Sequence, residues 1–217
     1  MSTPVNIYWR KRLVKVKEAL EDNGFAVCLA EDGEEACRVV ERELLPAAAP
    51  ASMSWGGSTT VISIGLYDRL KALPSIEIID TYDKSATREE ILERRRQALL
   101  ADLFVTGTNA VTEDGVLVNL DMIGNRVAAL AYGPRRVIVL AGRNKIVTGL
   151  GEAMARIKEF AAPVNAIRLG RKTPCAATGR CQECKSPERI CNVWAITEKS
   201  FPKSRITVVL INQDLGF

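Results

Sequence analysis

Apolar residues near the start of the chain recur every three or four positions, which is the spacing of one helix face. The stripe consists of Val5, Trp9, Leu13, Val16 and Leu20. Asn23 and Gly24 follow it, and these two residue types commonly end helices because they tolerate a left-handed backbone. The pattern predicts an amphipathic helix over residues 3–23, with one face buried.

Short apolar segments alternate with helical patterns along the rest of the chain. The segment 25–30 predicts a short buried strand. Asp32 and Glu35 have the spacing of a capping box, which predicts a helix that ends at Pro46. Helices are also expected up to about Leu73 and from Thr87 onward. Further strands are expected at 52–55, 76–80, 102–107, 136–141 and 206–211, with two short strands around a turn within 110–120.

The later strands are continuously apolar rather than alternating, as in the segments 137–140 and 206–211. Such strands are typical of a parallel sheet that helices cover on both faces. The sequence therefore predicts a single α/β domain over residues 1–217, with three layers and a mainly parallel sheet. A loop rich in glycine, proline and charge, about 170–191, interrupts the last crossover as an insertion.

That insertion carries four cysteines with the spacing C-x5-C-x2-C-x6-C: Cys175, Cys181, Cys184 and Cys191. The chain has no histidine, so sulfur would have to supply the ligands of a metal bound here. Four thiolates suit either a zinc ion or an iron-sulfur cluster. The alternatives are a disulfide or redox pair between Cys181 and Cys184, or inert free thiols. Cys28 and Cys37 are expected to be buried apolar residues.

Composition favours the metal interpretation. The chain has no run of about 20 apolar residues, and its start lacks the features of a signal peptide. The default compartment is the cytoplasm, where metal or redox chemistry is commoner than structural disulfides. The net charge of +4 is too small to indicate nucleic acid binding. Residues 168–205 include nine basic and three acidic residues. This excess of positive charge would lower the pKa values of the cysteine thiols, or it would form a solvated face or a patch for an acidic partner.

The loop Gly56, Gly57, Ser58, Thr59 is a candidate anion site. Glycines allow close backbone approach, and the hydroxyl groups add donors. The same residues also fit a plain turn in which Ser58 or Thr59 caps a helix.

A polar block from Gly107 to Arg126 follows the strand 102–107, at the sheet edge where open α/β sheets bind ligands. Glu113 is a candidate nucleophile or general base, although Glu113-Asp114-Gly115 is also an ordinary turn. Candidate hydrogen-bonding residues in the block are Asn109, Asn119 and Asn125. Lys145 follows the strand 136–141 and is suited to a phosphate or carboxylate.

Four parts of the sequence together resemble the LUD-domain family of lactate-utilisation protein C type. They are the loop at Trp55–Thr60, the block from Gly107, the segment Gly133–Lys145 and the cysteine cluster. The resemblance covers about Tyr8 to Phe217. It implies the fold of the ribose-5-phosphate isomerase, glucosamine-6-phosphate deaminase and CoA-transferase superfamily. It also implies that the glycine loop binds an anion and that Glu113 takes the place of the carboxylate that CoA-transferases acylate.

The leading hypothesis is thus a LUD-domain protein of lactate or organic-acid metabolism, with a small-anion pocket and a four-cysteine metal site. One alternative is a CoA-transferase-like or sugar-phosphate isomerase-like enzyme that uses Glu113. Another is a non-catalytic subunit that docks a redox partner. The expected partners are a small anionic ligand and other lactate-utilisation subunits, with a homo-oligomer allowed and neither nucleic acid nor membrane involved.

Overall fold

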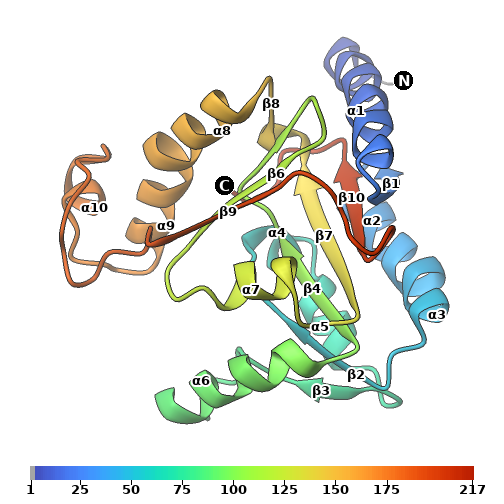
Figure 1. Cartoon of the computed structure of the whole chain (residues 1–217), viewed down its shortest axis with the longest axis horizontal. Helices are drawn as coiled ribbons and strands as arrows, with labels where there is room; N and C mark the ends of the chain where they lie inside the picture. The colour runs from blue at the N-terminus through green and yellow to red at the C-terminus, as the bar shows by residue number, and fades with distance from the viewer. Residues whose placement is uncertain (1–2) are drawn as a thin grey trace.

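A six-stranded parallel sheet forms the centre of the computed structural model, which describes residues 3–217 (Figure 1). In spatial order its strands are β1 (Ala26–Ala30), β10 (Ile206–Ile211), β7 (Arg136–Gly142), β4 (Leu103–Gly107), β2 (Ser52–Trp55) and β3 (Glu77–Ile79). All five pairings are parallel, and β7 is paired on both sides, with Val137 opposite Ile206 and Phe104. The predicted α/β fold is confirmed.

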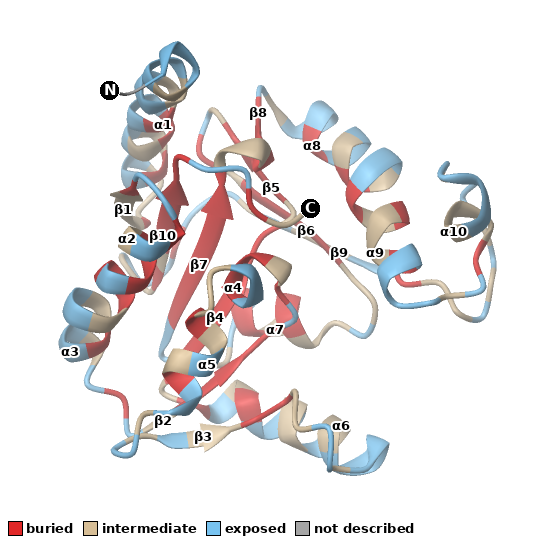
Figure 2. Ribbon diagram, turned by 180° about the vertical axis from the view of Figure 1, so that it is seen from behind, coloured by how far each residue is buried: buried red, intermediate tan, exposed pale blue. Residues whose placement is uncertain are grey.

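Helices cover both faces of this sheet, so the protein has three layers. Alternate residues of β7 point to opposite faces: Val137 and Val139 join one apolar cluster, while Ile138 and Leu140 join another. The first cluster includes residues of α1 (Pro4–Asp22), η2 (Ala98–Leu100) and α7 (Asn125–Ala131). The second includes residues of α2 (Gly33–Val39), η1 (Val40–Leu44), α3 (Leu45–Ala48), α4 (Thr59–Ser63) and α5 (Leu66–Lys71). Figure 2 shows the central strands buried between the two layers.

The first helix follows its sequence pattern except at its start, where Val5 of the predicted apolar stripe is 54% exposed. Leu13, Val16 and Leu20 are at most 2% exposed, and the helix ends at Asp22, before Asn23. Helix α6 (Arg88–Gln97) also begins as predicted, with a complete capping box between Thr87 and Glu90. No residue of α6 is buried, in agreement with its charged sequence.

A second, four-stranded sheet was not predicted as a separate layer. Its order is β8 (Ile146–Val147), β5 (Ala110–Thr112), β6 (Leu117–Asp121) and β9 (Val193–Thr197). A helical segment packs on it through Ala153 and Ile157, and runs through α8 (Leu150–Arg156), η4 (Ile157–Ala161) and α9 (Ala162–Arg168). The cysteine loop, with α10 (Pro174–Thr178), projects beyond α9 and away from the central sheet (Figures 1 and 2).

Pro46 does not end the second helix, contrary to the sequence-based prediction. The chain passes through a π-helical turn, η1, and Pro46 then lies in the first turn of α3. The helix is continuous through this region, and its widened π turn directly before Pro46 accommodates a residue that has no amide donor. The same arrangement recurs where η4 precedes Pro163 at the start of α9.

Two further expectations differ in detail. The helix expected up to Leu73 is divided in two at Gly65, which has a φ of +73°. Strand β1 lies at the edge of the sheet, and four of its five residues are only half-buried. Within residues 3–217, no helix combines the length and apolar character needed to span a bilayer.

Candidate functional site

The carboxyl ends of β2, β3, β4 and β7 open onto one cavity of about 710 Å³. Residues that follow these strands line it: Ser58 after β2, Tyr82 after β3, Thr108 after β4 and Lys145 after β7. This is the edge at which open parallel sheets bind ligands, and the volume lies in the usual range for small-molecule sites. The structure therefore places a candidate binding site where the sequence predicted one.

Most of the predicted ligand-binding residues lie together at this cavity. Those that line it are Gly57, Ser58, Thr59, Asn109, Asn125 and Lys145. Gly56 lies behind the wall, and a Cβ atom there would come within 2.9 Å of the Thr106 hydroxyl. Asn119 is completely buried and also supports the wall from behind.

Tyr82 holds the glycine loop in shape. Its hydroxyl group donates a hydrogen bond to the Gly56 carbonyl over 2.8 Å and accepts one from the Ser58 amide over 3.0 Å. Burial raises the pKa of the Tyr82 phenol, so this hydroxyl keeps its proton at neutral pH. Ser58 also caps α4 by accepting from the Val61 amide, which leaves the Ser58 hydroxyl proton free for a ligand.

Arg126 is a buried cation in the wall of the cavity, and it is only 6% exposed. Its guanidinium donates to oxygen atoms of Gly107, Asn109, Asn119 and Leu120. Its Nε lies 3.8 Å from a carboxylate oxygen of Asp121. Burial lowers the pKa of Arg126, but an arginine side chain remains charged at neutral pH. Arg126 therefore joins β6 of the small sheet to the end of β4 and to Asn109, which follows it.

The two asparagines that Arg126 contacts are fixed in orientation. The Asn109 side-chain oxygen also accepts from the Leu120 amide over 2.9 Å, and that of Asn119 accepts from the Asn109 amide over 3.3 Å. Each side-chain oxygen thus accepts two hydrogen bonds, and this pattern assigns the orientation of both side-chain amide groups. The Asn119 Nδ2 atom is buried and has no hydrogen-bond partner among the described residues.

Lys145 is the cavity residue with the most unusual environment. Its side chain is 3% exposed, and its ammonium group donates to the Thr60 hydroxyl over 2.8 Å. Within residues 3–217 it forms no ion pair with a carboxylate. Burial, together with the positive charges of Arg156 and Arg126, lowers the pKa of Lys145 to about 7. A buried lysine with one hydrogen bond and no counter-ion has donors to spare for a ligand.

Further cations surround the cavity. In all, six lysine or arginine side chains line it, against two aspartates, Asp68 and Asp121. The four not yet described are Lys84, Arg95, Arg168 and Arg171. None of these four pairs with a carboxylate in the part of the chain that the structure describes, and the Arg171 Nε atom is buried without a partner. The cavity therefore carries an uncompensated positive charge.

Glu113 lies apart from the cavity. It follows β5 in the hairpin turn, and its carboxylate accepts a hydrogen bond from Arg12 Nε of α1 over 2.8 Å. The Glu113 side chain is 40% exposed, and it is not among the residues that line the cavity. A catalytic role for Glu113 stays a prediction, and the site described above does not include it.

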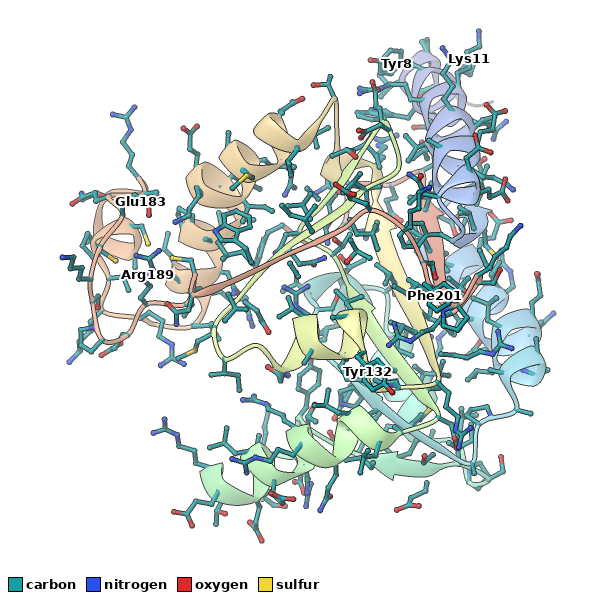
Figure 3. All side chains as sticks on the ribbon, viewed as in Figure 1. Tyr8, Lys11, Tyr132, Glu183, Arg189 and Phe201 are labelled. Atoms are coloured by element: carbon teal, nitrogen blue, oxygen red, sulfur yellow. The ribbon has the colours of Figure 1, made fainter. Side chains whose placement is uncertain are left out.

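The cysteine loop is held together by Arg189, which donates to the Cys184 carbonyl over 2.7 Å and to the Cys191 carbonyl over 2.9 Å. Figure 3 shows Glu183 and Arg189 in this loop, and the two side chains form an ion pair of 3.6 Å. Glu183 also pairs with Lys158 of η4. All four cysteines are free and half-buried.

These four cysteines do not form a ready metal site in this structure. Among residues 3–217, no group of three or more cysteine or acidic side chains is arranged to hold one ion. The donor chemistry suits zinc or an iron-sulfur cluster, but the geometry is not that of a four-thiolate site. The metal centre stays a prediction.

Metal analysis of protein purified without oxygen tests that prediction. We expect either zinc, or iron with sulfide and broad absorbance near roughly 400 nm. The double change Cys181→Ser and Cys184→Ser should remove the metal, because two of the four thiolates are lost. Cys28→Ser is the matched control and should keep it. Metal-free wild-type protein would contradict the prediction.

The sequence-based reasoning missed Arg126, Tyr82 and Arg156 as site residues. Arg126 ends the polar block, directly after Asn125, so its position beside a predicted ligand residue was the available signal. Arg156 lies on α8 and donates to the Asn109 carbonyl over 2.8 Å. Tyr82 follows a three-residue strand. Neither Tyr82 nor Arg156 lies in a recognisable motif, so only the fold brings them to the site.

The fold and the site define an α/β protein with a cation-lined cavity at the carboxyl edge of a parallel sheet. A family model of the LUD domain matches residues 13–211. The chain therefore belongs to the LUD-domain family, and it is a protein of the lactate-utilisation type. This confirms the resemblance found in the sequence.

One solved structure is similar over nearly the whole chain. It is described as the crystal structure of a DUF162 family protein from Deinococcus radiodurans at 1.70 Å resolution. The two sequences are 14% identical, the match covers 94% of this chain and 98% of that one, and the TM-score is 0.47. Among curated proteins, none matches this chain.

Proposed function

We propose that the cavity binds a small organic anion of the lactate and pyruvate class, and that the protein acts in lactate or organic-acid metabolism. One observation carries this proposal: Lys145 is buried in the cavity wall with a single hydrogen bond and no carboxylate partner. A buried cation without a counter-ion is costly. A bound carboxylate would offset that cost.

The surroundings of Lys145 support an anion rather than a cation or a neutral ligand. Arg126 and Arg156 both act on Lys145 as positive charges, and the guanidinium of each is already bonded to neutral oxygen atoms. Their charges are therefore only weakly compensated, with Asp121 3.8 Å from Arg126. Ser58 and Thr59 add hydroxyl donors at the same cavity. Hydroxyl groups and a cation together are suited to a carboxylate.

The size of the cavity supports a ligand that extends beyond the carboxylate. A volume of about 710 Å³ is much larger than a three-carbon acid needs. Tyr67 and Tyr82 form an aromatic part of the wall, with ring centroids 5.2 Å apart. Arg168 and Arg171 provide positive charge on a different segment from Lys145. The inner cations would bind the carboxylate, and the remaining space would admit a longer acid or a second molecule.

Isothermal titration calorimetry with L-lactate and with pyruvate tests the proposal. We expect at least one of the two acids to bind to the wild-type protein, and Lys145→Met to weaken that binding at least tenfold. A tenfold loss corresponds to about 1.4 kcal/mol, which is close to the lower end of the usual range for a hydrogen bond to a charged group. Lys199→Met, an exposed residue away from the cavity, is the control and should bind as the wild type does.

Lys145→Met should not unfold the protein, because it removes a buried amine that folding must desolvate. Its thermal unfolding midpoint is expected at or above that of the wild type at pH 6. A loss of binding can then be attributed to the site. Equal binding by Lys145→Met and the wild type, or no binding of either acid, would overturn the proposed function. The predicted partners, other lactate-utilisation subunits, and the predicted cytoplasmic location stay predictions.

A further inference from the structure

The amine of Lys145 has the placement of a nucleophile as well as that of an anion ligand. Lys145 lines the cavity, and its Nζ atom donates to the Thr60 hydroxyl. That hydroxyl in turn donates to the Leu215 carbonyl over 3.2 Å. The Thr60 hydroxyl proton is therefore already used, and Thr60 accepts from Lys145 rather than donating to it. In the neutral amine the nitrogen lone pair is thus not occupied by Thr60.

The charges around this amine favour its neutral form. Packed near it are Thr60 of α4, which is uncharged, and the cations Arg126 of α7 and Arg156 of α8. Together with burial, they lower the pKa of Lys145 to about 7, so a substantial fraction of the amine is unprotonated at neutral pH. Lysines that form Schiff bases are activated in this way, by desolvation or by a neighbouring cation.

We propose that Lys145 forms a Schiff base with 2-oxo acids that bind in the cavity. The inference rests on the proposed function, because the cations of the site are what would hold the carboxylate of such an acid. The carbonyl group of a 2-oxo acid is bonded directly to the carbon of its carboxylate. A carboxylate held by cations around Lys145 therefore brings its own carbonyl carbon close to the Nζ atom.

The reaction balances without a further reactant. The lone pair of the neutral Nζ atom attacks the carbonyl carbon while the carbonyl π bond breaks, and a proton passes from the nitrogen to the resulting alkoxide oxygen to give a carbinolamine. The carbinolamine then loses its hydroxyl group as water, with one proton taken up from solvent, and a carbon-nitrogen double bond forms. The product is a protonated imine that carries the carboxylate. No oxidation state changes overall, so neither an oxidant nor a metal is needed. Lactate has no carbonyl group and cannot react in this way.

Reductive trapping tests the proposal on the full chain. The protein is incubated with pyruvate and sodium cyanoborohydride, and the modified residue is identified by peptide mass spectrometry. We expect Lys145 to be the main modified residue, and Lys145→Met to reduce the total modification at least tenfold. L-lactate should give no modification and should protect Lys145 from pyruvate. The trapping rate at Lys145 should rise as the pH is raised toward about 7, because its amine loses its proton there.

A Lys145→Arg variant separates the two proposals, because it keeps the positive charge but has no nucleophilic amine. If pyruvate binds to the wild type in calorimetry but Lys145 is not trapped, the Schiff base is refuted and the anion site remains. If neither acid binds, both proposals fall. Modification spread evenly over exposed lysines, with no enrichment at Lys145, also refutes the Schiff base. Binding without trapping in Lys145→Arg, together with trapping in the wild type, supports both.

Discussion

Replacing Arg126 by methionine is expected to lower the free energy of unfolding by about 3 kcal/mol, because a buried hydrogen-bonded charge leaves its partners without a donor. The change leaves Asp121 without its cation. It also removes the side-chain hydrogen bonds to four residues: Gly107, Asn109, Asn119 and Leu120. The two asparagine oxygens each keep one backbone donor, which limits the loss. Urea denaturation of both proteins measures the effect.

Arg168→Met is the matched control. Arg168 lines the same cavity, but it is exposed, and its side chain bonds to Asn165 on the same helix. Its loss should change the free energy of unfolding by less than about 0.5 kcal/mol. Arg126→Lys should restore only part of the stability, since an ammonium group cannot reach four acceptors in a planar arrangement. Similar losses for Arg126→Met and Arg168→Met would show that Arg126 does not hold the wall together.

Replacing Gly115 by alanine is expected to cost about 2–5 kcal/mol, from backbone strain and from a steric clash together. Gly115 has a φ of +82°, and an added Cβ atom would lie 2.6 Å from the backbone carbon of Ala19 in α1. Neither backbone can move freely, because the Asn23 side chain donates to the carbonyls of both Asp114 and Gly115. The hairpin of β5 and β6 would be pushed away from α1.

Gly65→Ala separates the cost of backbone strain from the cost of the steric clash. Gly65 has a similar φ of +73°, but no atom lies within 4 Å of the position that an added Cβ atom would take. Its replacement should cost only the strain of the left-handed backbone, about 1–2 kcal/mol. The difference between the two variants in urea denaturation then measures the contact with α1. Equal losses would mean that the hairpin moves away from the helix at no cost.

Much of the fold could be predicted because its signals are local. The stripe of Leu13, Val16 and Leu20 has the period of a helix, and the capping box at Thr87 marks a helix start. Both depend on residues within a few positions of one another. Strand β9 gave no comparable signal, since it lies at a sheet edge and is half-buried. Its partner β6 lies 72 to 80 residues earlier in the chain, from Asp121 opposite Val193 to Leu117 opposite Thr197, so no local pattern reveals the pairing.

Those residues of the candidate site that directly follow a strand could be predicted from the sequence. Ser58, Asn109 and Lys145 each come shortly after a strand of the parallel sheet, and the carboxyl ends of such strands share one edge. Glu113 belongs to the same polar block, but the hairpin carries it to the far end of β5, where it meets Arg12. Polarity and spacing alone could not distinguish the two ends of a three-residue strand. The role of Arg126 depends on acceptors from several elements, which no local pattern reveals.

The wide turn η4 determines what the helix that follows it presents to the cavity. Ala153 and Ile157 pack on the small sheet, and Ala161 and Asn165 line the cavity, so four residues spaced by four share one side. In a regular α-helix each step of four residues rotates by about 40°, so the last of them would face elsewhere. The π turn takes up that rotation. A homologue with the same number of residues but a regular α-helix over 157–161 would turn Asn165 and Arg168 by about 100°, which would give it a different binding cavity on the same fold. Loss of one residue there would instead let a regular helix present the same face.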